Sequence, residues 1–250
     1  MELYMMKKWL GLCAAGLLLS LTACNDTMDP NDPASVRKYL TKQRIACTPN
    51  QFVSYAVNSD TAKMTLLLQA ALEIDAPADN GNNAVAIAAN KGNVMVLNYL
   101  FAHGAKADVR NSNGEPVIDN AVMMGNKEVV NLLLDQLKKE GYEVNNLSSA
   151  VLLAAKTGKA DMLEILAAAG APLETRGADG YYPIHLTVKG GHYDAMMFLI
   201  SKGVDVNIKC GQGYSVLDWA KNEGYTRLIK DLKKAGAKNT PAYLKEFGGK

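Results

Sequence analysis

Apolar residues and glycines recur every 33 residues along most of the chain. The pattern is clearest from Gly180 to Ala237, where it is written twice in succession. The first copy opens at Gly180, turns at Gly191 and closes from Gly203 onward, and adding 33 returns the second copy. The matching positions are Gly213 for Gly180, Leu217 for Ile184, Gly224 for Gly191, Leu232 for Leu199, Gly236 for Gly203 and Ala237 for Val204.

Subtracting the same period extends the pattern toward the N-terminus. One glycine of each copy keeps its register, and we interpret it as the residue just past a first helix, where a positive φ lets the chain reverse. A period of this length indicates repeats that bury their apolar faces against their neighbours. The register glycines are Gly92, Gly125, Gly158, Gly191 and Gly224.

Two short segments of the clearest copy resemble the ankyrin repeat. Tyr182-Pro183-Ile184-His185 is similar to the T-P-L-H motif of that family, and Gly203-Val204-Asp205-Val206-Asn207 is similar to its G-A-D-V-N motif. The resemblance implies a turn, two short antiparallel helices and an extended finger in each repeat. It predicts an all-α helix-turn-helix solenoid of about six repeats with short finger loops.

The repeats are expected between two caps. Asp32 as N-cap and Pro33 at the first helical position predict a capping helix within residues 32–47. Thr240 is expected to cap a last short helix within the tail, residues 238–250. The six repeats are expected at residues 48–80, 81–113, 114–146, 147–179, 180–212 and 213–237.

The third repeat departs from the pattern. A glycine is due near position 137 but arrives only at Gly141. We therefore expect a second helix that is about one turn longer than the others and a finger that is about four residues shorter. The result should be an irregular step between the third and fourth repeats.

The N-terminal segment has the composition of an export signal. Lys7-Lys8 precedes an apolar run, Trp9 to Leu19, that is too short to span a bilayer as a helix. The following Leu21-Thr22-Ala23-Cys24 resembles the lipobox of bacterial lipoproteins, which implies removal of residues 1–23 and lipid attachment to Cys24. The alternative is an ordinary signal cut nearby, with Cys24 a plain thiol, and Met5 or Met6 could equally be the true start.

The lipobox resemblance implies a location in the cell envelope. Residues 24–31 are interpreted as a solvated tether between the lipid and the fold. The anchor would lie in the outer membrane or the outer face of the inner membrane, with a periplasmic body; Asn25 favours the outer membrane under enterobacteria-like sorting. From Lys221 to Lys250 there are eight basic and three acidic residues. We interpret this run as a solvated terminal face, with contact to an anionic lipid surface as the alternative.

Composition and motifs offer little chemistry. The net charge of +2 gives no sign of a nucleic-acid partner, and no H-E-x-x-H, paired C-x-x-C or phosphate-binding glycine loop occurs. We therefore predict no catalytic, cofactor or metal residue, and structural roles for the three histidines. Cys47 and Cys210 should not form a disulfide, because elements five repeats apart lie farther apart than a disulfide spans.

The resemblance places partner binding on the concave side, formed by finger tips and first helices. Tyr181 and Tyr214 follow the opening glycines of adjacent repeats and should lie near one another, and tyrosine is common at binding hot spots. Met123-Met124 is an apolar pair where a polar one is expected. The alternative is that the tyrosines pack on neighbouring fingers and Met124 tucks under the third finger. The predicted partner-binding residues are Tyr181, Tyr214, Met123 and Met124 as hot spots, with Glu115, Lys156, Lys189 and Asn222 as a polar rim.

These features predict a monomeric, membrane-anchored protein–protein interaction module, a scaffold or adaptor. An inhibitor or immunity-type protein that blocks an envelope enzyme or toxin is the alternative. An enzyme is a third class, and it would need a polar cluster that the repeat pattern does not supply.

Overall fold

The computed structural model describes residues 28–247, so the predictions for the export signal and for Cys24 lie outside it. Within this range the chain forms fourteen α-helices, one short 3-10 helix and no strand. A single isolated β-bridge joins Arg110 and Pro116. The described part of the chain divides into two compact bodies, residues 28–105 and 106–247.

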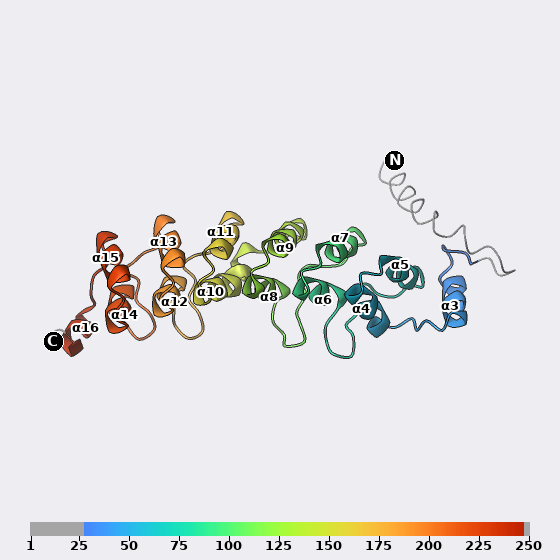
Figure 1. The fold of residues 1–250 in the computed structure, drawn as a ribbon, viewed down its shortest axis with the longest axis horizontal. Helices are drawn as coiled ribbons and strands as arrows, with labels where there is room; N and C mark the ends of the chain where they lie inside the picture. Colours follow the sequence, from blue (N-terminus) through green and yellow to red (C-terminus); the bar gives the residue numbers. More distant parts are fainter. Residues whose placement is uncertain (1–27, 248–250) are drawn as a thin grey trace. The chain divides into compact units, whose positions relative to one another are not determined.

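The N-terminal body consists of short helices that pack in pairs. Helix α4 packs on α5 and on α6, α6 packs on α7, and α3 packs on α5. Large apolar side chains such as Phe52, Leu67 and Leu97 are fully buried between them. The helices are α3 (Pro33–Lys42), α4 (Pro49–Val57), α5 (Thr61–Gln69), α6 (Ala84–Asn90) and α7 (Val94–Ala102) (Figure 1).

Helix α3 begins where the sequence predicts. The Asp32 carboxylate accepts hydrogen bonds from the backbone N–H groups of Ala34 and Ser35 at 3.0 and 3.1 Å, which confirms Asp32 as the N-cap. Arg37 Nε donates to the Ala70 carbonyl at 2.8 Å. This bond ties α3 to the end of α5.

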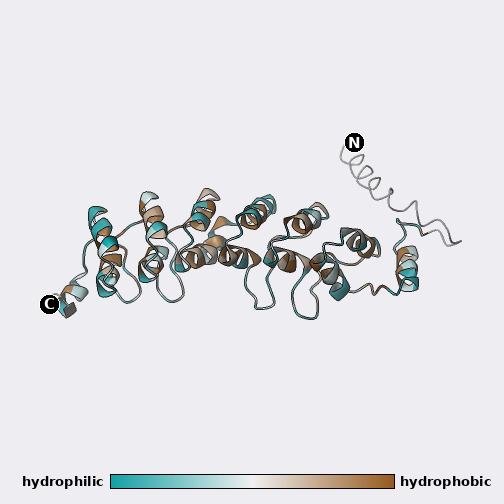
Figure 2. Ribbon diagram, viewed as in Figure 1, coloured by the Kyte–Doolittle hydropathy of each residue, from teal (hydrophilic) through white to brown (hydrophobic). Residues whose placement is uncertain are grey.

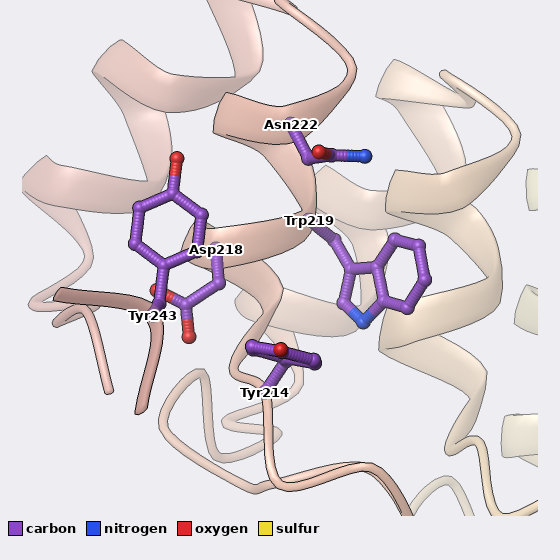
Figure 3. A pocket seen from close by; sticks show the side chains of 5 residues that line it. All are labelled: Tyr214, Asp218, Trp219, Asn222 and Tyr243. Atoms are coloured by element: carbon purple, nitrogen blue, oxygen red, sulfur yellow. The ribbon is translucent and has the colours of Figure 1, made fainter. Parts of the chain in front are cut away.

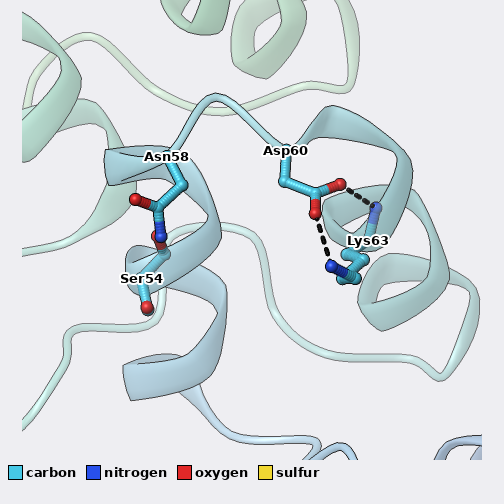
Figure 4. Close-up of polar contacts among 4 residues, drawn as sticks. All are labelled: Ser54, Asn58, Asp60 and Lys63. Carbon is cyan, nitrogen blue, oxygen red and sulfur yellow. Dashed lines mark hydrogen bonds and ion pairs between the residues drawn. The ribbon is translucent and has the colours of Figure 1, made fainter.

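The turn between α4 and α5 is held by local polar contacts (Figure 4). Asp60 Oδ1 accepts from the Lys63 N–H at 3.1 Å, and Lys63 Nζ lies 2.8 Å from Asp60 Oδ2. This hydrogen-bonded ion pair holds the pKa of Asp60 below its usual value. Asn58 Nδ2 donates to the Ser54 carbonyl at 2.9 Å. Ser59, between Asn58 and Asp60, adopts a left-handed backbone conformation with φ 59°.

The C-terminal body repeats one arrangement four times. The first helices α8, α10, α12 and α14 pack on one another in order, and each packs on its own second helix. Figure 2 shows that α10 is largely hydrophobic, whereas α15 carries many hydrophilic residues. The helices are α8 (Val117–Met124), α9 (Lys127–Lys139), α10 (Ser148–Lys156), α11 (Ala160–Ala168), α12 (Pro183–Lys189), α13 (Tyr193–Ser201), α14 (Val216–Asn222), α15 (Thr226–Lys234) and α16 (Pro241–Phe247).

The irregular step after the third repeat is confirmed. Helix α9 has 13 residues, whereas the second helices α11, α13 and α15 each have 9. The chain turns at Gly141, with φ 75°, and then forms the 3-10 helix η1 (Val144–Leu147) in place of a finger. The delayed glycine therefore lengthened the helix at the expense of the finger.

The last helix also begins at its predicted cap. The Tyr243 N–H donates to Thr240 Oγ1 at 3.3 Å, and the Leu244 N–H donates to the Thr240 carbonyl at 3.1 Å. Thr240 is buried, so these bonds fix the start of α16 against the final repeat.

Candidate partner-docking surface

The two fingers that carry Tyr181 and Tyr214 are closed by equivalent backbone bonds. The Gly177 N–H donates to the Tyr181 carbonyl at 2.8 Å, and the Cys210 N–H donates to the Tyr214 carbonyl at 2.9 Å. The Gly211 N–H also donates to the Gly180 carbonyl at 2.8 Å. This bond joins the two fingers, so both tyrosines are presented by a continuous, hydrogen-bonded turn structure.

Tyr181 is not the exposed anchor that the sequence analysis expected. Its side chain is only 8% exposed, and its ring meets the Trp219 ring edge-on with centroids 5.6 Å apart. Its hydroxyl donates to Gln212 Oε1 at 3.2 Å, on the next finger. The alternative, packing on the neighbouring finger, therefore describes Tyr181, because Trp219 and the finger leave its ring little contact with solvent.

Tyr214 and Trp219 extend this aromatic cluster. Their rings are nearly perpendicular, with centroids 6.4 Å apart, so Trp219 contacts both tyrosines. Lys189 Nζ lies 4.7 Å from the Tyr181 ring centroid and 5.3 Å from that of Trp219. Trp219 was not among the predicted binding residues, although it stands one period after Leu186 in the repeat register.

A small aromatic pocket opens beside this cluster. We define the aromatic pocket by Tyr214, Asp218, Trp219, Asn222 and Tyr243, which line an open cavity of about 110 Å³. Figure 3 shows Tyr243 and Trp219 on opposite sides of the pocket, with Tyr214 below and Asn222 at the other end. A finger, α14 and α16 thus supply one aromatic ring each.

Asp218 forms the polar wall of the pocket and stands one period after His185. Its carboxylate accepts from the Ser215 N–H at 2.9 Å, from Thr240 Oγ1 at 2.8 Å and from Asn239 Nδ2 at 2.6 Å. Because the side chain is 1% exposed and its oxygens are engaged, it anchors the C-terminal segment that carries Tyr243.

A larger groove lies along α8, α10 and α12, with a cavity volume of about 450 Å³. Three of the predicted partner-binding residues, Glu115, Met123 and Lys156, line it. The Met123 side chain is 48% exposed, a large apolar group at the edge of a polar surface. The other lining residues are Asp119, Asn120, Ser149, Leu152, Leu153, Gly177, Ala178, Asp179 and Leu186.

Asp119 gives the groove an unusual acidic group. Burial raises the pKa of its carboxyl, against a hydrogen bond from Ser149 that lowers it. Glu115 adds a further rise by like-charge repulsion, and Arg110 opposes it. Its Oδ1 is buried without a hydrogen-bond partner among the residues of the described range. The groove therefore combines an unsatisfied acceptor with apolar side chains.

The remaining predicted residues fall outside this groove. Met124 is 61% exposed but does not line the groove. Asn222 lines the aromatic pocket with Tyr214, whereas Tyr181 and Lys189 adjoin it through Trp219. The predicted surface thus separates into two places on the first helices and fingers of the C-terminal body.

The histidines make backbone contacts. His185 is fully buried, its Nε2 donates to the Tyr214 carbonyl at 3.3 Å, and burial lowers its pKa to about 4. His192 Nε2 donates to the Lys156 carbonyl at 3.0 Å, and His103 Nδ1 lies 2.8 Å from the Tyr99 carbonyl. These contacts agree with the structural roles that the sequence predicts.

Metal-ligating side chains do not gather within residues 28–247. No group of three or more histidine, cysteine, aspartate or glutamate side chains in this range could hold a metal ion. Cys47 and Cys210 are free thiols. No helix in this range is long and apolar enough to cross a bilayer.

Comparison with known proteins identifies the repeats. Two models of ankyrin repeats match residues 85–134 and 150–242, which together make up more than half of the chain. The chain belongs to the ankyrin-repeat family. An ankyrin repeat domain from Acinetobacter baumannii, solved by crystallography, has a similar fold, with a TM-score of 0.67 at 21% identity. That likeness covers 75% of this chain and 98% of the other.

Matches to curated proteins cover part of this chain and part of each relative. An L-asparaginase of Dirofilaria immitis is 27% identical over 160 residues, 62% of this chain and 26% of that protein. An ankyrin repeat-containing protein of Treponema pallidum is 28% identical over 145 residues, 56% of this chain and 45% of that protein. The chain thus spans less than half of either relative. Ankyrin repeats are generally non-enzymatic protein-interaction modules, and the partial match to an asparaginase does not alter that.

Proposed function

We propose that this ankyrin-repeat chain is a membrane-anchored protein–protein interaction module of the bacterial cell envelope, a scaffold or adaptor. Its partner docks on the first helices and fingers of the C-terminal body, at the groove and the aromatic pocket. The observation that carries the proposal is that five of the binding residues predicted from the sequence line these two cavities: Glu115, Met123 and Lys156 in one, and Tyr214 and Asn222 in the other.

The two cavities have the composition of a binding surface. Each combines apolar or aromatic side chains with polar ones, as protein interfaces do. Both are built on packed helices and hydrogen-bonded fingers. Little conformational entropy is lost when such a surface binds, so more of the contact energy is available for affinity.

Docking is tested by co-purification from gently solubilised native envelopes. We expect one stoichiometric partner with the wild-type chain and its loss with the double variant Met123→Glu/Asn222→Glu, because both side chains are exposed at the cavities. Glu164→Lys/Lys230→Glu, on the second helices, is the matched control and should retain the partner. A partner that both variants retain would contradict this docking surface. The activity of the recovered partner, with and without the chain, separates a scaffold from an inhibitor.

The anchor is tested separately by metabolic labelling with palmitate. The full chain expressed in a bacterium should incorporate the label and sediment with membranes, because the lipobox resemblance makes Cys24 the acceptor. Cys24→Ser should abolish both results, whereas Cys47→Ser should change neither. Labelling that persists in Cys24→Ser would overturn the lipid anchor and leave the docking proposal standing.

A further inference from the structure

The aromatic pocket has the size and lining of a binding site for one side chain. Its cavity of about 110 Å³ is somewhat smaller than an engineered apolar cavity of about 150 Å³ that binds benzene. Tyr214, Trp219 and Tyr243 supply the walls from three different elements (Figure 3). An aliphatic side chain or a small aromatic ring fits such a space.

The polar wall of the pocket does not favour the binding of a cation. Aromatic cages can bind ammonium groups, so this alternative has to be weighed. The Asp218 carboxylate is buried and already accepts bonds from Ser215, Thr240 and Asn239. It therefore has little capacity left to pair with an incoming cation.

A lysine ammonium group already lies over each of two rings of the pocket. Lys221 Nζ lies 5.7 Å from the Tyr243 ring centroid and donates to Asn239 Oδ1 at 2.7 Å. Lys189 Nζ lies 5.3 Å from the Trp219 ring centroid. A third positive charge between these rings would be repelled by both lysines. A neutral apolar group is not repelled.

Two positive charges lie beside the pocket. Lys221 lies over the Tyr243 ring and Lys189 over the Trp219 ring. Such a field attracts negative charge and discourages positive charge. Acidic residues beside the seated side chain would therefore be favoured.

From these observations we infer that the aromatic pocket binds one apolar anchor residue of the partner, aliphatic or aromatic, flanked by acidic residues. This inference rests on the proposed function and assigns the chemistry of one part of its docking surface. The anchor fills the space between the three rings, and its acidic neighbours meet Lys189 and Lys221 at the edge.

Trp219 reports on the pocket directly. The chain has two tryptophans, Trp9 and Trp219, so the full chain with Trp9→Phe carries its only indole in the pocket wall. The probes are three capped pentapeptides: Glu-Glu-Leu-Glu-Glu, Glu-Glu-Ala-Glu-Glu and Lys-Lys-Leu-Lys-Lys. We expect a saturable change of Trp219 emission with the first, at least about tenfold weaker binding of the second, and no saturable change with the third.

Variants separate the pocket from its charged edge. Tyr243→Ala should weaken the acidic leucine peptide at least about tenfold, because one wall is lost. Lys189→Gln should weaken the binding of both acidic peptides by the same factor, so the preference for leucine over alanine should remain. Lys202→Gln removes a comparable lysine, with Nζ 5.4 Å from the Phe198 centroid, and should change nothing. Unchanged helical circular dichroism confirms that each variant is folded.

Three results would overturn the inference. Equal binding of the leucine and alanine peptides would exclude an anchor seat, and stronger binding of the lysine peptide would favour a cation. A change of Trp219 emission with phosphatidylglycerol vesicles but with no peptide would assign the surface to lipid. If the peptides behave as expected but envelopes yield no partner, the proposed function fails and the pocket stands. If envelopes yield a partner that Tyr243→Ala and Lys189→Gln both retain, the proposed function stands and the inference about the pocket fails.

Discussion

Ala71 and Ser59 adopt left-handed backbone conformations, each with φ 59°, at positions that hold glycine one period later. A non-glycine residue in this conformation is strained by about 1 kcal/mol or more. The side chains of the two residues differ in the contacts that they make. Ser59 Oγ accepts from Asn93 Nδ2 at 2.6 Å, whereas the methyl group of Ala71 is exposed.

This difference predicts opposite effects of glycine. Ala71→Gly should raise the free energy of unfolding by about 0.5 kcal/mol, because relief of strain exceeds the extra entropy of the unfolded chain. Ser59→Gly should give no gain, because it also removes the bond to Asn93. Urea denaturation of the full chain, followed by circular dichroism, measures both. Destabilisation by Ala71→Gly would show that this turn is not strained.

His185 should make stability depend on pH. Its pKa is about 4 in the folded chain and near 6.5 when unfolded, so between these values the unfolded chain binds more protons. Stability is therefore full above about pH 6.5 and falls as pH decreases toward 4. By pH 5 the loss from this residue should reach about 2 kcal/mol.

The comparison variant is His185→Gln, which does not titrate. Urea denaturation at pH 7 and pH 5 should show a smaller loss for the variant than for the wild type, whatever its stability at pH 7. Asp119, whose pKa is raised, contributes with the opposite sign, but it is present in both chains. Equal losses would mean that His185 can be protonated in the folded chain.

At the scale of helices, the register glycines are not equivalent. Gly158 and Gly224 both have positive φ, 70° and 71°, at the same position of their repeats. A Cβ on Gly158 would lie 2.4 Å from His192 Nδ1, whereas a Cβ on Gly224 would meet nothing within 4 Å. Backbone strain is common to both sites, and the clash belongs to Gly158 alone.

Alanine substitution should separate these two effects. Gly224→Ala should lower the free energy of unfolding by about 1 kcal/mol, from backbone strain. Gly158→Ala should cost more, because the His192 ring must also move and give up its bond to the Lys156 carbonyl. Denaturation of Gly158→Ala, Gly224→Ala and the wild type under one condition measures both costs. Equal costs would indicate that the His192 ring moves aside freely.

The repeat pattern predicted the elements well because each is specified locally. The delayed Gly141 predicted the long α9 and a shortened finger, and Asp32 and Thr240 predicted helix starts. Each of these features depends on a cap or a turn whose residues are adjacent in the chain. The packing arrangement of the helices was predicted from the family resemblance.

The site was predicted only in part, because it depends on contacts across repeats. Register placed Tyr181 and Tyr214 on adjacent fingers, but not the Trp219 ring that buries Tyr181. Trp219 could have been found, since it replaces the leucine of the previous repeat with a larger ring. Tyr243 could not, because it belongs to α16, which has no counterpart in the other repeats.

At the scale of the whole molecule, the proposal joins a lipid-anchored N-terminus to a docking surface on the C-terminal body. The matched relatives are longer than the segment they share with this chain, so they do not identify a partner. The specificity of an ankyrin-repeat protein resides in the side chains its first helices and fingers present. On the proposed docking surface these are the apolar and acidic groove and the aromatic pocket with the two lysines beside it.

Photocrosslinking in living cells tests this claim most directly, because it captures a partner whose identity is still unknown. A photoreactive phenylalanine analogue is placed at Met123 or Asn222 on the docking surface, and at Glu164 or Lys230 on the second helices, all exposed positions. We predict that Met123 and Asn222 give an adduct with the same envelope protein and that Glu164 and Lys230 give none. An adduct from Glu164 or Lys230 alone would contradict the account.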